Sequence, residues 1–83
     1  MEIFYSTRFL RSFKRLPNEI KDKLEGKERI IVKDIFSKSL KTHKLNGAFE
    51  GYYAFSIDYK NRVIFEINDN KIVFYDVGDH DIY

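Results

Sequence analysis

The stretch that decides the fold lies at the C-terminus and reads VFYDVGDHDIY over residues 73–83. Aromatic and β-branched residues dominate its first five positions, which is typical of a β-strand. Gly78 then interrupts the run, and a glycine can adopt the positive φ that lets a chain leave a sheet. The segment therefore predicts a strand that ends near Gly78, followed by a short terminal segment.

Titratable side chains gather directly after this strand. His80 lies between Asp79 and Asp81, and Tyr83 is the last residue. An imidazole is the side chain best suited to proton transfer near neutral pH, and the neighbouring carboxylates can orient the ring and hold its proton. The alternative is a solvated polar tail, which is the usual fate of a C-terminus. This segment alone leaves both interpretations open.

Two more strands are predicted upstream. Apolar side chains alternate with other residues over positions 53–57 and again over positions 63–67. If the apolar positions of the second strand face the core, Arg62 points to the opposite, open face of the sheet. The other interpretation is a surface arginine that pairs with Glu66 or Asp76.

The last strand is expected to extend this open face. With Val73, Tyr75 and Val77 facing the core, a continuation of the strand would bring His80 to the open side. Adjacent strands lie about 4.8 Å apart. Arg62 and His80 are therefore expected to converge on one phosphate group.

The first half of the chain predicts a short strand and a helical hairpin. Residues 2–6 form the strand, after which Ser6 or Thr7 offers a helix N-cap. Large apolar side chains then recur at helical spacing, which predicts an amphipathic helix of about ten residues. Pro17 ends that helix and suits the first turn of a second one, which continues to about Ser37. The order βααβββ predicts an α+β fold, a small antiparallel sheet with the helical hairpin packed on one face.

Composition narrows the classes of function. The chain has 83 residues, of which 43% are hydrophobic, so we expect one domain over residues 1–83 with a single core. It has no cysteine and two histidines, which argues against disulfides and against a structural zinc site. No apolar run approaches the roughly 20 residues that span a membrane. We therefore expect a cytoplasmic protein without membrane contact.

The net charge of +2 is divided unevenly. Residues 1–44 carry twelve lysines and arginines against six aspartates and glutamates, whereas residues 45–83 carry three against seven. A basic half can attract phosphates or dock an acidic partner, although lysines on helix exteriors are also ordinary surface residues.

Basic side chains also concentrate in a predicted loop over residues 38–51. They are Lys38, Lys41, His43 and Lys44. The lysines are candidate phosphate contacts. His43 can transfer a proton, contact a phosphate or simply be exposed, and these three interpretations stay open.

Four segments of the chain occur together, in the same order, in a known family. They are the H-x-L-x-G pattern from His43 to Gly47, the run GYYAFSI over residues 51–57, Arg62 followed by Val-Ile-Phe, and the ending from Gly78 to Tyr83. The chain resembles the RelE/ParE toxin superfamily, in particular the RelE- and YafQ-like mRNA interferase branch of type II toxin–antitoxin systems. Its ending is one residue shorter than the pattern typical of that branch.

The resemblance implies a ribosome-dependent mRNA endoribonuclease that uses neither a metal nor a small-molecule cofactor. Its implied partners are a cognate antitoxin protein, mRNA and the ribosome. Cleavage of RNA without metal requires that the 2′-OH loses a proton, that the charge on the pentavalent phosphate is stabilised, and that the 5′ oxygen gains a proton.

Each requirement has a candidate in the sequence. His80 is the natural acid or base, with Asp79 and Asp81 as orienting carboxylates, and His43 is the second candidate for proton transfer. Arg62 presents a planar fork of donors to the phosphate. Tyr83 can stack on a base or bond the phosphate. The candidate RNA-binding residues are Lys38, Lys41 and Lys44.

Two other functions fit the same resemblance. The first is a ParE-like inhibitor of DNA gyrase, against which the presence of two histidines argues. The second is a catalytically weak member that mainly binds its antitoxin. Residues Tyr53, Phe55 and Ser56 favour this second alternative, because several relatives carry basic residues on that strand.

Overall fold

The structure is a computed structural model, and it describes residues 1–79. The helices of this part are α1 (Thr7–Lys14) and α2 (Asn18–Ile31). The strands are β1 (Glu2–Tyr5), β2 (His43–Lys44), β3 (Tyr53–Ser56), β4 (Asn61–Asn68) and β5 (Lys71–Asp79), and short 3-10 helices cover Lys38–Leu40 and Gly47–Phe49. No helix within residues 1–79 is long and apolar enough to cross a lipid bilayer.

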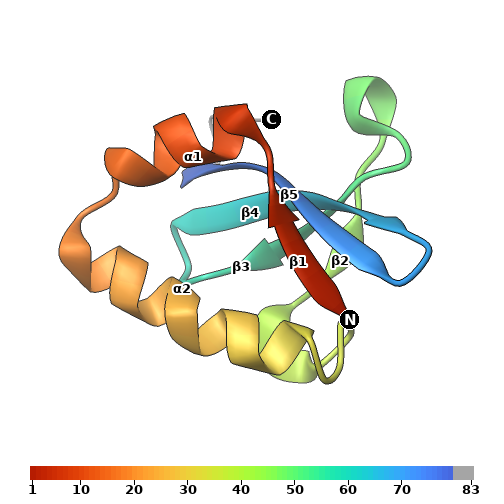
Figure 1. Cartoon of the computed structure of the whole chain (residues 1–83), viewed down its shortest axis with the longest axis horizontal. Helices are drawn as coiled ribbons and strands as arrows, with labels where there is room; N and C mark the ends of the chain where they lie inside the picture. Colours follow the sequence, from red (N-terminus) through yellow and green to blue (C-terminus); the bar gives the residue numbers. More distant parts are fainter. Residues whose placement is uncertain (80–83) are drawn as a thin grey trace.

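The strands form one sheet in the order β1-β5-β4-β3-β2 (Figure 1). Neighbours from β3 to β5 are antiparallel, as expected. The segment predicted as a loop adds the strand β2, which pairs antiparallel with β3, whereas β1 pairs parallel with β5, so the sheet is mixed. A hairpin turn forces two strands to be antiparallel, and no hairpin joins β1 to β5. Ser6 extends the parallel pairing, since its N–H donates to the Phe74 carbonyl at 3.0 Å and its hydroxyl to the Tyr75 carbonyl at 2.6 Å. The predicted α+β fold is confirmed.

The helical hairpin begins where the sequence predicts. The hydroxyl of Ser6 accepts the backbone N–H of Phe9 at 2.9 Å, which caps α1, and α2 starts directly after Pro17. However, α2 ends at Ile31 and not near Ser37. A tight turn follows it, in which the Asp34 carboxylate accepts the N–H of Phe36 at 3.1 Å, and such a local bond competes with helical hydrogen bonding.

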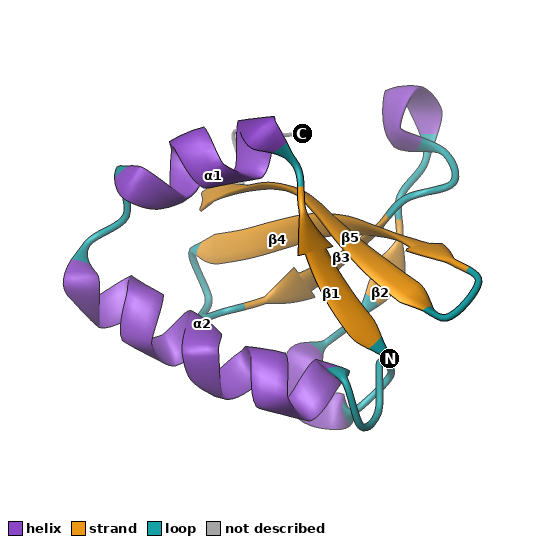
Figure 2. Cartoon of the chain, in the orientation of Figure 1, coloured by secondary structure: helices purple, strands orange, loops and turns teal. Residues whose placement is uncertain are grey.

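One apolar core lies between the helices and the sheet, whose backbones are drawn in Figure 2. Phe9 of α1 and Leu24 of α2 pack in the same cluster as Phe55, Phe65 and Phe74 of the three central strands, and each of these five side chains is at most 2% exposed. Both helices therefore cover one face of the sheet, and the opposite face is called the open face below.

A β-bulge changes the phase of β5. Ile64 pairs with Asp76 while Phe65 pairs with Phe74, so Tyr75 is an extra residue on β5. Ile72 and Phe74 consequently face the core, together with Val77 beyond the bulge. The expectation that Val73 and Tyr75 face the helices was wrong, because the bulge lets the strand change phase between Phe74 and Val77.

Candidate functional site

Arg62 lies on the open face near the end of the central strands. It pairs with Ser56 on β3 and with Gly78 on β5, while its neighbour Val63 is buried in the core. One Nη of Arg62 donates to the backbone carbonyl of Tyr59 at 3.3 Å. Within residues 1–79, Arg62 forms no ion pair, and neither predicted acidic partner neutralises it. The guanidinium charge is therefore not neutralised by an ion pair in this part of the chain.

The end of β5 lies directly beside Arg62. Gly78 is opposite Arg62, and Asp79 follows it opposite Asn61. Asp79 is exposed and is the last described residue. The predicted His80, Asp81 and Tyr83 lie outside the described residues.

His43 lies on the same face as Arg62, on the edge strand β2. It pairs with Ala54, which pairs with Ile64, and Ile64 is two residues along β4 from Arg62. Side chains two residues apart share a face, so His43 and Arg62 lie on the same face with their Cα atoms about 12 Å apart. His43 is exposed, and its Nδ1 lies 3.2 Å from the Lys41 carbonyl. The structure thus brings both residues to one face, at a separation that a long side chain and a substrate can bridge.

The three candidate lysines are exposed but do not share a face with His43. Lys44 pairs with Tyr53, whose ring packs against the core, so Lys44 and His43 point to opposite sides of β2. Lys38 begins the 3-10 helix after α2, and Lys41 caps its end with a φ of 53°. This left-handed conformation is uncommon for a residue with a side chain. The role of these lysines in RNA binding stays a prediction.

The sequence suggested Asp76 only as a possible partner of Arg62, but Asp76 bonds to α1 instead. It is 4% exposed, and one carboxylate oxygen accepts the Arg8 Nε–H at 3.0 Å. The other oxygen accepts the Ser12 hydroxyl at 2.6 Å and the Val77 N–H at 2.8 Å. The hydrogen bond that Arg8 donates to Asp76 also raises the pKa of Arg8 above its ordinary value. The detectable signal was an aspartate inside an apolar strand, together with a polar pair at i, i+4 on α1.

The bonds of Asp76 to Arg8, Ser12 and Val77 are called the clamp below. Three aromatic rings gather on the open face beside this clamp. The ring centroids of Tyr52 and Tyr75 are 5.3 Å apart, and Phe49 lies 6.1 Å and 6.2 Å from them. The Arg8 guanidinium sits over the Tyr75 ring at 5.3 Å. Burial, followed by the nearby Glu66 charge, raises the pKa of Tyr52. Half-buried aromatic rings of this kind offer stacking surfaces for nucleic-acid bases.

Acidic and imidazole side chains do not assemble as a metal centre in the part described. Within residues 1–79, no group of three or more His, Cys, Asp or Glu side chains is placed to hold an ion. Arg62 can bind an anion, and His43 can transfer a proton.

Comparison with solved structures places the architecture among known folds. The structure of YafQ from E. coli strain BL21(DE3) superposes with a TM-score of 0.83 and 19% identity, over 96% of this chain and 93% of that one. The YoeB/ParE toxin from Agrobacterium tumefaciens gives 0.82 and 15%, over 96% and 99%. The YoeB–YefM complex from Staphylococcus aureus gives 0.79 and 21%, over 94% of both chains.

The chain has the fold of these toxins. No protein-family model matches its sequence, and no curated protein matches it either. With 15–21% identity to these three structures, the toxin fold alone is shared. In this chain, the shared fold places Arg62 and His43 on the face opposite the helices.

Proposed function

We propose that this chain is the toxin of a type II toxin–antitoxin pair and that it acts as a ribosome-dependent mRNA endoribonuclease. The observation that carries the proposal is Arg62, an arginine on the open face of a toxin fold that forms no ion pair within residues 1–79. An arginine fork held next to the end of β5 suits the charge that develops on a phosphate during cleavage.

The proposed reaction is a transesterification within RNA. The 2′ oxygen attacks the adjacent phosphorus and loses its proton to a base, while the bond from phosphorus to the 5′ oxygen breaks and that oxygen gains a proton. Arg62 stabilises the equatorial oxygens of the pentavalent phosphate. His80 and His43 are the proposed acid and base. The products are a 2′,3′-cyclic phosphate and a 5′-hydroxyl end.

The proposed partner is a cognate antitoxin. Structures with this fold include YafQ in the E. coli DinJ–YafQ toxin–antitoxin complex and YoeB in the S. aureus YoeB–YefM toxin–antitoxin complex. The basic N-terminal half of this chain is suited to a segment that carries acidic residues. We propose that such a segment folds on the toxin and keeps it from the ribosome.

Induced expression of the chain in a bacterial host tests this function. The endoribonuclease is expected to stop growth and to create new mRNA 5′ ends inside reading frames, with plasmid supercoiling unchanged. Loss of gyrase-dependent supercoiling without new 5′ ends would identify a ParE-like gyrase inhibitor and reject the nuclease.

A binding-only role has one observation in its favour. The strand positions between His43 and Arg62 are held by Ala54 and Ile64, which are apolar and fully buried, so they contribute no charge. A chain that binds its antitoxin without inhibiting growth or cleaving mRNA would support this role.

A further inference from the structure

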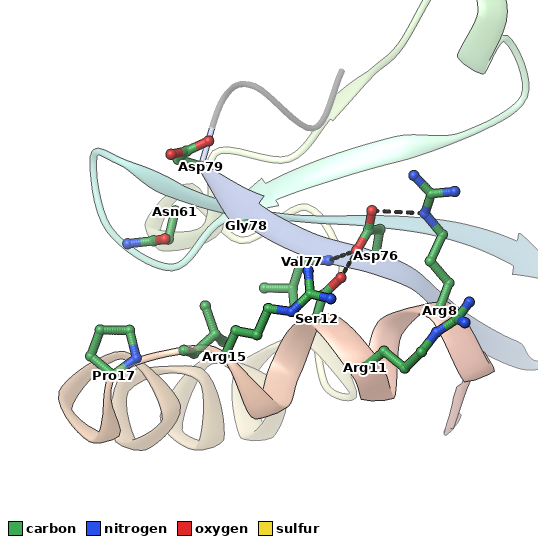
Figure 3. A pocket seen from close by; sticks show the side chains of 11 residues that line it. Arg8, Arg11, Ser12, Arg15, Pro17, Asn61, Asp76, Val77, Gly78 and Asp79 are labelled. Atoms are coloured by element: carbon green, nitrogen blue, oxygen red, sulfur yellow. Dashed lines mark hydrogen bonds and ion pairs between the residues drawn. The ribbon is translucent and has the colours of Figure 1, made fainter.

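A groove separates α1 from the C-terminal end of β5. It has a volume of about 680 Å³. Figure 3 shows the side chains of Arg8, Arg11 and Arg15 along its helical side, with Asp79 at the end away from Arg8. The β5 side of the groove runs from Asp76 to Asp79. It therefore includes Gly78, the residue of β5 that pairs with Arg62.

The three arginines form a row along one face of the helix. Positions 8, 11 and 15 follow the i, i+3, i+7 spacing that places side chains on one face, and they span about 10 Å along the axis. The opposite face of α1 carries Phe9, which is buried in the core, and Phe13, which packs against it. The row therefore lies outside the core and leaves three guanidinium groups along the groove.

Most of this positive charge is not neutralised by ion pairs among residues 1–79. Asp76 uses both of its oxygens to hold Arg8, Ser12 and its own strand. Arg11 and Arg15 are exposed and form no ion pair with any residue from 1 to 79. Asp79, the second carboxylate of the lining, has interactions of its own at the far end. The groove thus holds one positioned arginine and two arginines that form no ion pair in the part of the chain that the structure describes.

We propose that this groove binds the phosphodiester backbone of an RNA strand, with Arg11 and Arg15 contacting phosphates and Asp76 fixing the position of Arg8. The proposal rests on the proposed function and extends it, because the strand would be held along α1 and led toward Arg62. Planar guanidinium forks match phosphate oxygens in pairs. The apolar part of the lining is confined to Leu16, Pro17 and Val77, which offers little to the side chains of a peptide.

The test compares two charge-matched variants of the full chain. The first, Arg11→Gln with Arg15→Gln, removes the unpaired arginines of the groove. The second, Lys23→Gln with Arg29→Gln, removes two exposed charges from α2, each of which already pairs with a glutamate on its own helix. Both variants lose two positive charges at exposed positions, and thermal unfolding checks that both remain folded.

Binding of a labelled 2′-O-methyl RNA, which cannot be cleaved, is measured by fluorescence anisotropy over a range of salt concentrations. Each phosphate contact to a single strand contributes about 0.7 to the slope of log K against log salt, so the groove variant should lose about 1.4 from that slope. We expect its affinity at low salt to fall by about tenfold or more, and that of the α2 variant to change far less. Equal slopes and affinities for the two variants would overturn the proposal.

Two further outcomes separate this proposal from its neighbours. If binding of a glutamate-rich peptide requires Arg11 and Arg15 but binding of RNA does not, the groove is a peptide site and the RNA site is rejected. Salt-dependent RNA binding that needs both arginines, in a chain that cleaves no mRNA in cells, would support the groove and reject the nuclease. If the parent cleaves mRNA normally and the groove variant binds RNA as tightly as the parent, the nuclease is supported and the groove is rejected.

Discussion

Asp76 joins β5 to α1 near the end of the strand. It lies in a strand of apolar residues, yet its carboxylate is satisfied by a side chain from each of two positions of α1 and by the N–H of Val77. Its side chain is 6% exposed, whereas that of Arg8 is 55% exposed. The burial of one partner and the exposure of the other predict unequal effects when each is removed.

Replacing Asp76 with alanine should therefore destabilise the fold by about 2–4 kcal/mol, because the Ser12 hydroxyl and the Val77 N–H lose their acceptor. Arg8→Ala should cost far less, since Arg8 is exposed and an exposed ion pair contributes little. Urea unfolding of both variants measures the difference, with Glu66→Ala on the neighbouring strand as the control. Similar losses for the Asp76 and Glu66 variants would contradict the clamp.

At the scale of elements, the turn between β3 and β4 depends on Asp58. One of its carboxylate oxygens accepts the N–H of Lys60 at 2.9 Å and the N–H of Asn61 at 2.7 Å, and it also accepts the Asn61 amide at 3.2 Å. Burial acts to raise the pKa of Asp58, but the hydrogen bonds from Asn61 and Lys60 outweigh it, and the pKa is lowered. The turn positions Arg62, which directly follows Asn61.

This lowered pKa predicts how stability depends on pH. A carboxylate whose pKa is depressed by folding contributes stability above its unfolded pKa of about 3.9, and that contribution is lost as pH falls through the folded pKa. The melting temperature of the parent should consequently fall more steeply below about pH 4 than that of Asp58→Asn. Glu50→Gln, in an exposed loop, serves as the control. Parallel curves for the parent and the Asp58 variant would show that the turn does not depend on the ionised carboxylate.

The elements also show which parts of the fold the sequence could predict. Helical spacing, the Ser6 cap and Pro17 located both helix starts, because those signals are local. The end of α2 escaped prediction, since apolar residues continue to Phe36 while the Asp34 turn stops the helix. The bulge at Tyr75 was not predicted either. Residues 72–75 are all apolar or aromatic, so a two-residue alternation does not show which of them face the core.

At the scale of the whole molecule, the parts of the site that depend on pairing between distant segments could not be predicted from the sequence. The placement of Arg62 on the open face followed from strand alternation. The short strand β2, which brings His43 to the same face, has two residues and no pattern of its own. The contact of Arg8 and Ser12 with Asp76 joins residues more than sixty positions apart, which no local pattern reveals.

The uneven charge of the whole chain predicts a salt-sensitive partner. A small protein from the adjacent reading frame should copurify with the tagged chain and suppress its toxicity. Because the Debye length falls from about 10 Å at 0.1 M salt to about 3 Å at 1 M, the affinity of the pair should drop severalfold over that range. Isothermal titration at several salt concentrations measures this. Recovery of the free chain alone from its native cells would contradict the proposed partner.

The most direct test of the central claim is cleavage of mRNA on programmed ribosomes, mapped by primer extension with the purified chain. The account predicts cuts in mRNA only when ribosomes are present, and a rate that falls about 10²–10³-fold in Arg62→Ala, as expected for losing a donor to the transition-state oxygens. Arg62→Lys should restore only part of that rate, because a point charge does not reproduce the two-pronged fork. An Arg62→Ala variant that remains folded and cleaves at the parental rate would contradict the account, as would a parent that leaves ribosome-bound mRNA intact.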